Sequence, residues 1–197
     1  MEKNKIKYYK MQKDLSILIL TFDLDQEIKP AKFLPKVCHK VGEKTMIEIA
    51  IETSLKLNPT KLVVYVSKNN IECINKTLKH NNYSKLVNYC ILDNELNGKR
   101  KLSIGQQCFE NKNVLLIPGN SPLLSSKLLF RIISENRDIK IHKSFFFLRK
   151  ENLSELDNMS NFPITKDFTY SETEIKRVET KGDLQEILEI LEKKNKK

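Results

Sequence analysis

Hydrophobic residues along the chain gather in short, nearly unbroken runs, and between the runs they recur at helical intervals. An unbroken apolar run bounded by polar residues is typical of a strand that is buried on both faces. Five such runs predict strands of one sheet. They cover residues 15–20, 61–67, 86–92, 113–117 and 143–148.

The segment from Thr45 to Leu57 instead repeats apolar residues every three or four positions, which predicts a helix, and Asn58-Pro59 ends it. Further helices are predicted at residues 69–80, 102–110, 123–136 and 181–197. Strands that alternate with helices favour a mainly parallel sheet with helices on both faces, which is a Rossmann-like α/β fold.

Residues 153–178 break this alternation, because they contain Pro163 and only short β-like pieces such as Asp167–Glu172. No internal repeat and no linker divides the 197 residues, so we expect a single domain over residues 1–197. Within it, residues 1–13 are expected to form a basic N-terminal arm, and a basic tail ends the helix predicted at 181–197.

The formal net charge of +10 and the pI near 9.3 favour anionic partners such as nucleotides, phosphosugars or nucleic acid. Most of the basic residues are lysines that are spread evenly along the chain, without interleaved aromatic residues. Because a nucleic-acid surface needs clustered charge, nucleic acid is not the partner that we expect.

The lengths of the apolar runs and the cysteine pattern also indicate which cellular compartment to expect. No apolar run approaches the ~20 residues of a membrane span, and the charged first residues do not resemble a signal peptide, so we expect no membrane association. The four cysteines (Cys38, Cys73, Cys90 and Cys108) form no CxxC pair. We therefore expect free thiols in the cytoplasm, with neither a zinc site nor disulfides.

One turn stands out as a candidate ligand site. The run from Val114 to Ile117 ends at Pro118-Gly119, and Pro122 opens a second apolar segment after a short polar turn. This pattern predicts a buried strand that leads into a helix, and ligands of α/β proteins bind at such strand ends. An acidic residue there would hold a metal ion, but the chain has Asn120.

Three motifs in order carry a resemblance to a known family. The stretch "FLPKVCHKVGEKTM", from Phe33, resembles the "LPKVLH…GKPM" signature of the sugar-phosphate nucleotidyltransferases, and most closely the uridylyltransferase domain of the bacterial N-acetylglucosamine-1-phosphate enzyme. "PGNSPLLSSKLL" looks like that family's "GDxPL" turn, and "VETKGDLQEILEILE", from Val178, is similar to its late "IDTPEDL" element. The resemblance covers about residues 15–192. The matching residues of the first motif are Leu34, Pro35, Lys36, Val37, His39, Gly42 and Met46.

The resemblance implies a nucleotidyltransferase fold and a defined reaction. An oxygen of N-acetylglucosamine 1-phosphate attacks the α-phosphorus of UTP, which yields UDP-N-acetylglucosamine and releases pyrophosphate. Positive charge around the phosphates and a Mg²⁺ ion assist such a transfer. In the family the metal is held at the positions that correspond to Asn120 and Glu179, while Lys36 contacts phosphates and Lys29 stands where the family has a catalytic arginine.

The resemblance also implies nucleotide-binding positions. They are Leu20 and Thr21 after the first strand, Asp93 and Gly98 in the loop that would read uracil, and Gly119 in the turn. His39 is expected to pack or hydrogen-bond near Lys36, and we do not predict that it acts as a base.

Departures from the family pattern leave alternatives open. The family's glycine-rich loop is replaced by "TFDLDQEIKPAK", from Thr21, which lacks glycine and carries three acidic residues. Lys29 lacks the bidentate fork of an arginine. Only about sixty residues separate Asn120 from Glu179, which predicts a shortened sugar-side region at 153–178. Three alternatives therefore stay open for this protein. It is a uridylyltransferase of weakened activity, a cytidylyltransferase of the same fold, or a non-catalytic module that binds a nucleotide or a partner.

Each candidate site residue also has a plain structural interpretation. Asn120 suits a turn, Glu179 suits the exposed entry of a helix, and Lys36 suits the surface after Pro35. The base, the sugar and the oligomeric state stay open from the sequence.

Overall fold

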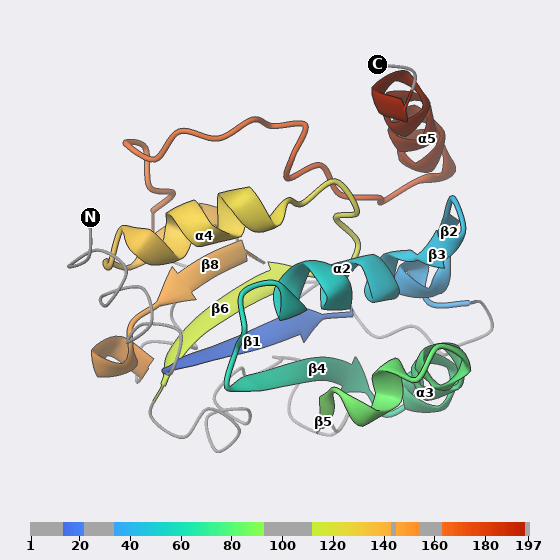
Figure 1. Ribbon diagram of the computed structural model, residues 1–197, viewed down its shortest axis with the longest axis horizontal. Coiled ribbons are helices and arrows are strands. Elements are labelled where there is room, and N and C mark those ends of the chain that lie inside the picture. Colours follow the sequence, from blue (N-terminus) through green and yellow to red (C-terminus); the bar gives the residue numbers. More distant parts are fainter. Residues whose placement is uncertain (1–13, 22–33, 93–111, 143–144, 154–162, 196–197) are drawn as a thin grey trace.

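The computed structural model describes residues 14–21, 34–92, 112–142, 145–153 and 163–195 (Figure 1). Six of its strands form one sheet in the order β5-β4-β1-β6-β8-β7. The strands β5, β4, β1 and β6 are parallel, whereas β8 runs antiparallel to both β6 and β7. Their bounds are β1 Leu15–Leu20, β4 Lys61–Ser67, β5 Asn88–Leu92, β6 Asn113–Pro118, β7 Ile139–His142 and β8 Phe145–Leu148.

The five predicted strands are confirmed, and the mainly parallel α/β fold class with them. The sequence prediction missed β7, which is only four residues long and has a lysine, Lys140, in its middle. Its apolar positions Ile139 and Ile141 face the core, but two alternating positions are too few to stand out in a sequence. This short strand and its neighbour β8 form the antiparallel edge of the sheet.

Four α-helices are described, and they follow the helical spacing of the sequence; their bounds are α2 Met46–Leu55, α3 Ile71–His80, α4 Ser126–Ser134 and α5 Lys181–Asn195. The helix predicted at 102–110 lies outside the described residues. A hairpin that was not predicted, β2 (Lys40–Val41) with β3 (Lys44–Thr45), precedes α2. Gly42 makes its turn possible, because its φ of 69° lies in the left-handed region.

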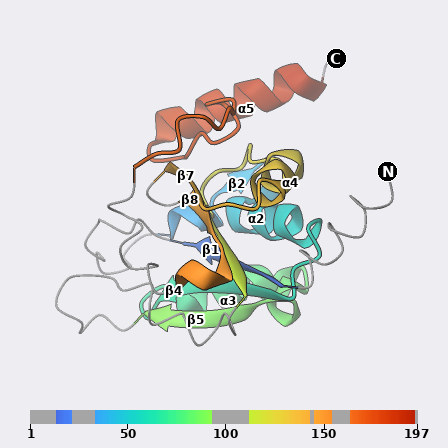
Figure 2. The ribbon, with the colours of Figure 1, turned by 90° about the vertical axis from the view of Figure 1, so that its left-hand side faces the viewer.

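The strands bury alternate residues on the two faces of the sheet. Ile17 and Ile19 of β1 belong to the larger core cluster, together with residues of α2, α3 and α4, so these three helices cover the same face. Leu18 and Leu20 point to the other face, where Leu153 packs with them in a second cluster. The prediction of helices on both faces is therefore not met by the described residues, since no α-helix among them packs in the cluster on the other face. The C-terminal helix α5 lies apart from the sheet, beside the β2–β3 hairpin at the top right of Figure 1 and above α2 and α4 in Figure 2.

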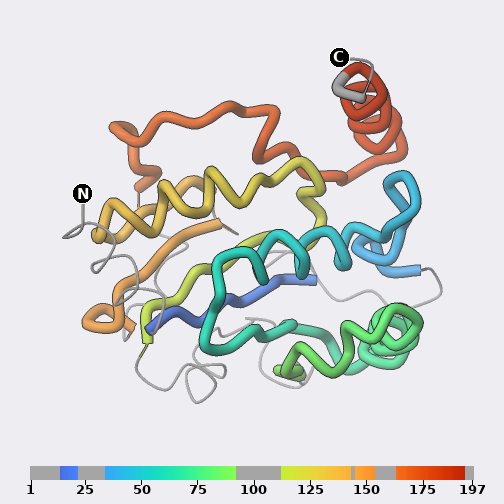
Figure 3. The backbone as a smooth tube through the Cα atoms, viewed as in Figure 1, coloured from blue at the N-terminus to red at the C-terminus, as the bar shows by residue number. Residues whose placement is uncertain are grey.

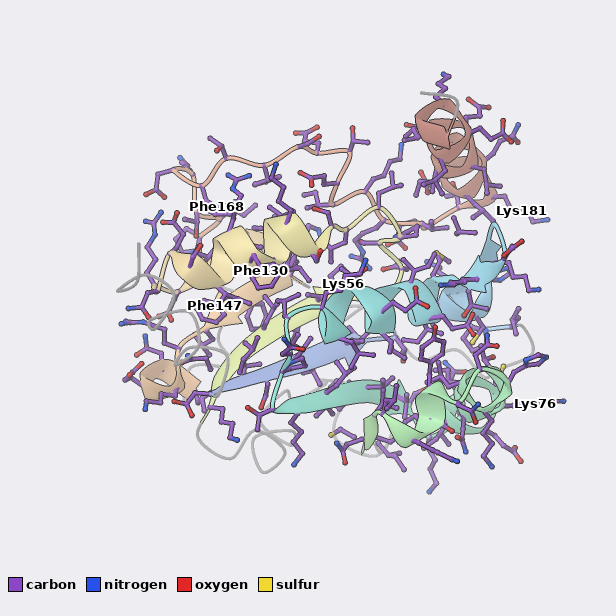
Figure 4. All side chains as sticks on the ribbon, viewed as in Figure 1. Lys56, Lys76, Phe130, Phe147, Phe168 and Lys181 are labelled. Carbon is purple, nitrogen blue, oxygen red and sulfur yellow. The ribbon has the colours of Figure 1, made fainter. Side chains whose placement is uncertain are left out.

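Residues 163–180 form a segment without helix or strand that runs along α4, includes turns, and ends at α5 (Figure 3). The prediction of β-like pieces at Asp167–Glu172 is wrong, because this segment contains no strand. It packs through side chains instead: Phe168 enters the larger core near Phe130 and Phe147 (Figure 4), and the Arg131 guanidinium lies 5.3 Å from the centre of its ring. Arg131 also donates to the carbonyl of Thr169 at 2.7 Å.

Two further findings concern the length of the helices and the state of the cysteines. Within the described residues, no helix has the length and apolar character needed to cross a bilayer. Cys38, Cys73 and Cys90 are free thiols, and Cys108 lies outside the described residues.

Candidate functional site

The candidate site lies where the carboxyl ends of β1 and β6 meet. The two strands are parallel neighbours, with Leu20 in register with Pro118. On one side of β1 the sheet continues through β4 and β5, and on the other side through β6, so the chain reverses its direction of winding between β1 and β6. Ligands of open α/β sheets bind at such a point, outside the carboxyl ends of the strands.

Gly119 lets the two strand ends approach closely. Its backbone N–H donates to the carbonyl oxygen of Leu20 at 2.7 Å. A Cβ atom at position 119 would lie 2.7 Å from the same oxygen and 3.2 Å from Val37, so only glycine fits there. The glycine predicted to bind nucleotide therefore shapes the edge of the sheet.

The two predicted nucleotide-binding residues after β1 also contact the sheet. The Leu20 side chain is 2% exposed and packs in the second core cluster. The Thr21 hydroxyl donates to the carbonyl oxygen of Tyr65, within the neighbouring strand β4, at 2.8 Å. Both residues hold the strand ends in place, and their predicted contact with nucleotide stays a prediction.

Lys36 and Glu179 form an ion pair beside these strand ends. Lys36 opens a short 3-10 helix (Lys36–Cys38) directly before the hairpin, and its Nζ atom lies 2.6 Å from Oε2 of Glu179. The Lys36 side chain is 43% exposed and that of Glu179 is 37% exposed. A ligand in solvent can therefore reach this pair.

The start of α5 holds Glu179 in position. The backbone N–H of Thr180 and its hydroxyl donate to Oδ2 of Asp183, at 2.8 Å and 2.9 Å, and the N–H of Asp183 donates back to the Thr180 hydroxyl at 3.2 Å. This reciprocal pair is a capping box for α5. The N–H of Glu179 also donates to Asp183 Oδ2, at 3.1 Å, so the backbone that carries Glu179 is tied to the cap.

Asn120 fastens the segment before α5 to the end of β6. Its side chain is buried, and its Nδ2 atom donates to the carbonyl oxygen of Val178 at 3.1 Å and to Oε1 of Glu179 at 3.2 Å. The N–H of Val178 donates to the carbonyl oxygen of Asn120 at 2.9 Å. Lys36, Asn120 and Glu179, which the resemblance assigns to the phosphate and metal site, therefore lie together at the carboxyl ends of β1 and β6.

The sequence analysis did not identify Arg177 as a site residue, but the structure places it at the centre of this group. Its Nε atom donates to Oδ1 of Asn120 at 3.2 Å, and its Nη2 atom lies 3.0 Å from Oε1 of Glu179. The side chain is 15% exposed. One signal was available in the sequence. Residues two apart in extended backbone point to the same side, so the side chain of Arg177 is expected on the same side as that of Glu179.

These contacts determine the ionisation of the site. Burial by itself would raise the pKa of Glu179, but the hydrogen bond from Lys36 and the charge of Arg177 outweigh it and hold that pKa below its ordinary value of 4.5. Burial lowers the pKa of Arg177, although the charge of Glu179 opposes this shift. An arginine keeps its proton in proteins, so the group consists of one carboxylate and two cations.

The predicted metal ligands do not fit a divalent ion in this arrangement. Oδ1 of Asn120 accepts from Arg177, and the two oxygens of Glu179 face Lys36 and Arg177. Among the described residues, no three His, Cys, Asp or Glu side chains come together in a group that could hold a metal ion.

Other predicted site residues fall elsewhere. Lys29, Asp93 and Gly98 lie outside the described residues, as does the acidic loop after Thr21. His39 is exposed, and its backbone carbonyl accepts from the N–H of Met46 at 3.1 Å.

No family model matches the sequence, and no curated protein sequence is significantly similar to it. Solved structures are similar to it in fold. A 4-diphosphocytidyl-2C-methyl-D-erythritol synthase from Anaerococcus prevotii matches with a TM-score of 0.62 and 13% identity, over 92% of this chain and 97% of that one. The chain has a nucleotidyltransferase-like α/β fold.

Two further matches involve one mycobacterial protein. Rv0371c of Mycobacterium tuberculosis H37Rv matches with a TM-score of 0.66 and 10% identity, over 90% of this chain and 98% of that one. The same protein in a complex with manganese gives a TM-score of 0.64 and 12% identity, over the same shares. At these identities the similarity establishes the fold, and the manganese is a property of that neighbour.

Proposed function

We propose that this protein transfers a nucleotidyl group from a nucleoside triphosphate to an acceptor that carries a phosphate. The observation that carries the proposal is the convergence of Lys36 and Arg177 at the carboxyl ends of β1 and β6. Lys36 and Arg177 place positive side chains where ligands of this fold type bind, and such side chains would attract an anion such as a triphosphate.

The reaction needs positioning more than covalent help from the protein. A phosphate oxygen of the acceptor bonds to the α-phosphorus of the nucleotide, the bond from that phosphorus to the bridging oxygen breaks, and pyrophosphate leaves with the electron pair. Lys36 is the exposed cation, and it would exchange Glu179 for a phosphate oxygen. Arg177 would supply a second positive charge from a fixed position behind it.

The predicted substrates are UTP and N-acetylglucosamine 1-phosphate, from the resemblance of residues 33–46 to the uridylyltransferases. A cytidylyltransferase is the second candidate, because a cytidylyl-transferring synthase shares the fold over nearly its whole chain. None of the steps above uses a Mg²⁺ ion bound to Asn120 and Glu179, since the described contacts of these two residues do not fit one. The cytoplasm remains the compartment that we expect.

The test is pyrophosphate release by the full chain with each of the four nucleoside triphosphates, combined with N-acetylglucosamine 1-phosphate or with a polyol phosphate. We expect release with UTP and the sugar phosphate, and release with CTP and the polyol phosphate would select the second candidate. Nucleotide binding without release from any pair would support the non-catalytic module instead. The absence of both nucleotide binding and pyrophosphate release would overturn the proposal.

A further inference from the structure

We propose that the guanidinium of Arg177 takes the place of a divalent metal ion at the end of β6. In this arrangement Asn120 and Glu179 hold an arginine, and the site binds phosphate without a metal bound to these two residues. The consequence for phosphate rests on the function proposed above. The consequence for metal binding does not.

The first argument is the position of the guanidinium. It reaches both residues that were predicted as metal ligands: Nε donates to Oδ1 of Asn120 at 3.2 Å, and Nη2 lies 3.0 Å from Oε1 of Glu179. Arg177 is part of the packed structure, because only 15% of its side chain is exposed. Its segment is also held beside the end of β6 by the hydrogen bond from the N–H of Val178 to the carbonyl oxygen of Asn120. A metal ion coordinated by the same oxygens would have to displace it.

The second argument is the orientation of the Asn120 amide. Its Nδ2 atom donates to the backbone carbonyl of Val178, which can only accept, so the nitrogen must lie on that side. The same nitrogen faces Oε1 of Glu179 at 3.2 Å. A metal held by both residues needs an oxygen from each, whereas here Asn120 offers Glu179 a donor.

The third argument is charge. Among the described contacts of this group, Glu179 is the carboxylate that both Lys36 and Arg177 approach, so two positive charges already lie against it. A divalent ion bound to Glu179 would bring two more positive charges beside these cations in a partly buried place, which Coulomb repulsion opposes. An aspartate at position 120 would offset one of these charges, but the neutral amide of Asn120 does not. Asn120 and Arg177 thus form a matched pair, because an amide oxygen suits a singly charged guanidinium better than a hard divalent cation.

The direct test is a titration of the full chain with Mn²⁺ alone, followed by the electron paramagnetic resonance signal of the free ion. We expect no Mn²⁺ binding by the wild type that depends on Glu179, so that the wild type and Glu179→Gln give the same curve. The double variant Asn120→Asp with Arg177→Gln removes the guanidinium and restores a second carboxylate, and it should bind Mn²⁺ at least tenfold more tightly than the wild type.

Arg137→Gln is the matched control. Arg137 also pairs with carboxylates, those of Glu135 and Asp167, but it follows the C-terminal end of α4, whereas Asn120 precedes the N-terminal end of that helix, and its loss should leave Mn²⁺ binding unchanged. Wild-type binding of one Mn²⁺ per chain that weakens tenfold or more in Glu179→Gln would overturn the inference. This comparison of wild type with Glu179→Gln also decides the question if the double variant does not fold.

A second titration uses pyrophosphate in the presence of EDTA and tests the consequence for phosphate. We expect the wild type to bind pyrophosphate without metal, and Arg177→Gln to bind it at least tenfold more weakly. Binding that requires added metal would contradict the inference. Absence of pyrophosphate binding under both conditions would instead count against the proposed function, while the Mn²⁺ titration would still decide the role of Arg177.

Discussion

The Nζ atom of Lys36 lies 2.6 Å from Oε2 of Glu179, although 143 positions of the chain separate the two residues. The pair joins the segment after β1 to the entry of α5 across the carboxyl ends of the parallel strands. The carboxylate of Glu179 therefore occupies the ammonium group of Lys36, which is the group that a phosphate would contact. A ligand that carries phosphate must therefore compete with Glu179 for Lys36.

Lys36→Ala should weaken the binding of a nucleoside triphosphate about tenfold, which corresponds to about 1.5 kcal/mol, the lower end of the range for hydrogen bonds to charged groups. We choose the lower end because the side chain is partly exposed. Calorimetry on both proteins measures the change. Lys40→Ala removes an exposed lysine from the neighbouring hairpin and should change the affinity less than twofold. Equal losses in the two variants would show that only diffuse positive charge matters.

Glu179→Gln should strengthen pyrophosphate binding, by roughly two- to fivefold, because it releases Lys36 and Arg177 from a competing charge that is only partly buried. If Glu179 were a metal ligand, the same variant should bind pyrophosphate more weakly, because loss of the ligand would remove the metal ion that holds the anion. Pyrophosphate titration of both proteins in EDTA, and again with Mg²⁺, separates the two. Weaker binding in the variant would contradict the prediction.

The stability that Glu179 contributes should disappear in acid. Its pKa in the folded protein lies below the ordinary value of 4.5, so its contribution is fully present above that value and is lost as the pH falls through the folded pKa. At pH 7 the wild type should exceed Glu179→Gln in free energy of unfolding by about 0.5 kcal/mol, a small figure because solvent screens the pair. Urea denaturation at pH 7 and near pH 3 measures both proteins. A difference that persists in acid would mean that the carboxylate charge is not its source.

Gly119→Ala should destabilise the fold by about 1–3 kcal/mol, because the new methyl group would lie 2.7 Å from the carbonyl oxygen of Leu20 and backbone cannot move aside cheaply. Gly182→Ala is the matched control. The nearest atom to its methyl group would be Thr180 Oγ1 at 3.6 Å, and alanine in the first turn of α5 should stabilise by about 0.5 kcal/mol. Thermal and urea unfolding of the two variants should therefore shift in opposite directions.

Asn120→Asp, made alone, should destabilise the protein by about 1–3 kcal/mol in the absence of metal. The change removes the Nδ2 donor to Val178 and brings a second carboxylate to Oε1 of Glu179, now 3.2 Å from the amide nitrogen. Addition of Mn²⁺ should not restore stability while Arg177 is present. Recovery of the melting temperature with Mn²⁺ in this single variant would show that the metal displaces the guanidinium.

Much of the fold could be predicted from the sequence because burial leaves a local record. The run at 61–67 coincides with β4 from its first residue to its last, the run at 15–20 does the same for β1, and the run at 113–117 stops one residue before the end of β6. A strand covered on both faces is apolar over most of its length, which is why these runs are visible in the sequence. The three motifs of the resemblance, together with the rule on strand ends, placed Lys36, Asn120 and Glu179 together. The carboxyl ends of the parallel strands share one edge of the sheet, and each residue was assigned just after, or just beyond, such an end.

The direction of β8 and the role of Arg177 were decided only in three dimensions. A run such as Phe145–Leu148 has the same burial pattern whichever way it runs, so nothing local distinguishes its antiparallel pairing with β6. Arg177 lies in a segment without helix, strand or periodicity, in a chain crowded with cations. Its guanidinium reaches Asn120 and Glu179 because the backbone bond from Val178 to Asn120 sets the register of that segment against β6, and a contact between residues so far apart in the chain leaves no pattern in either stretch of sequence.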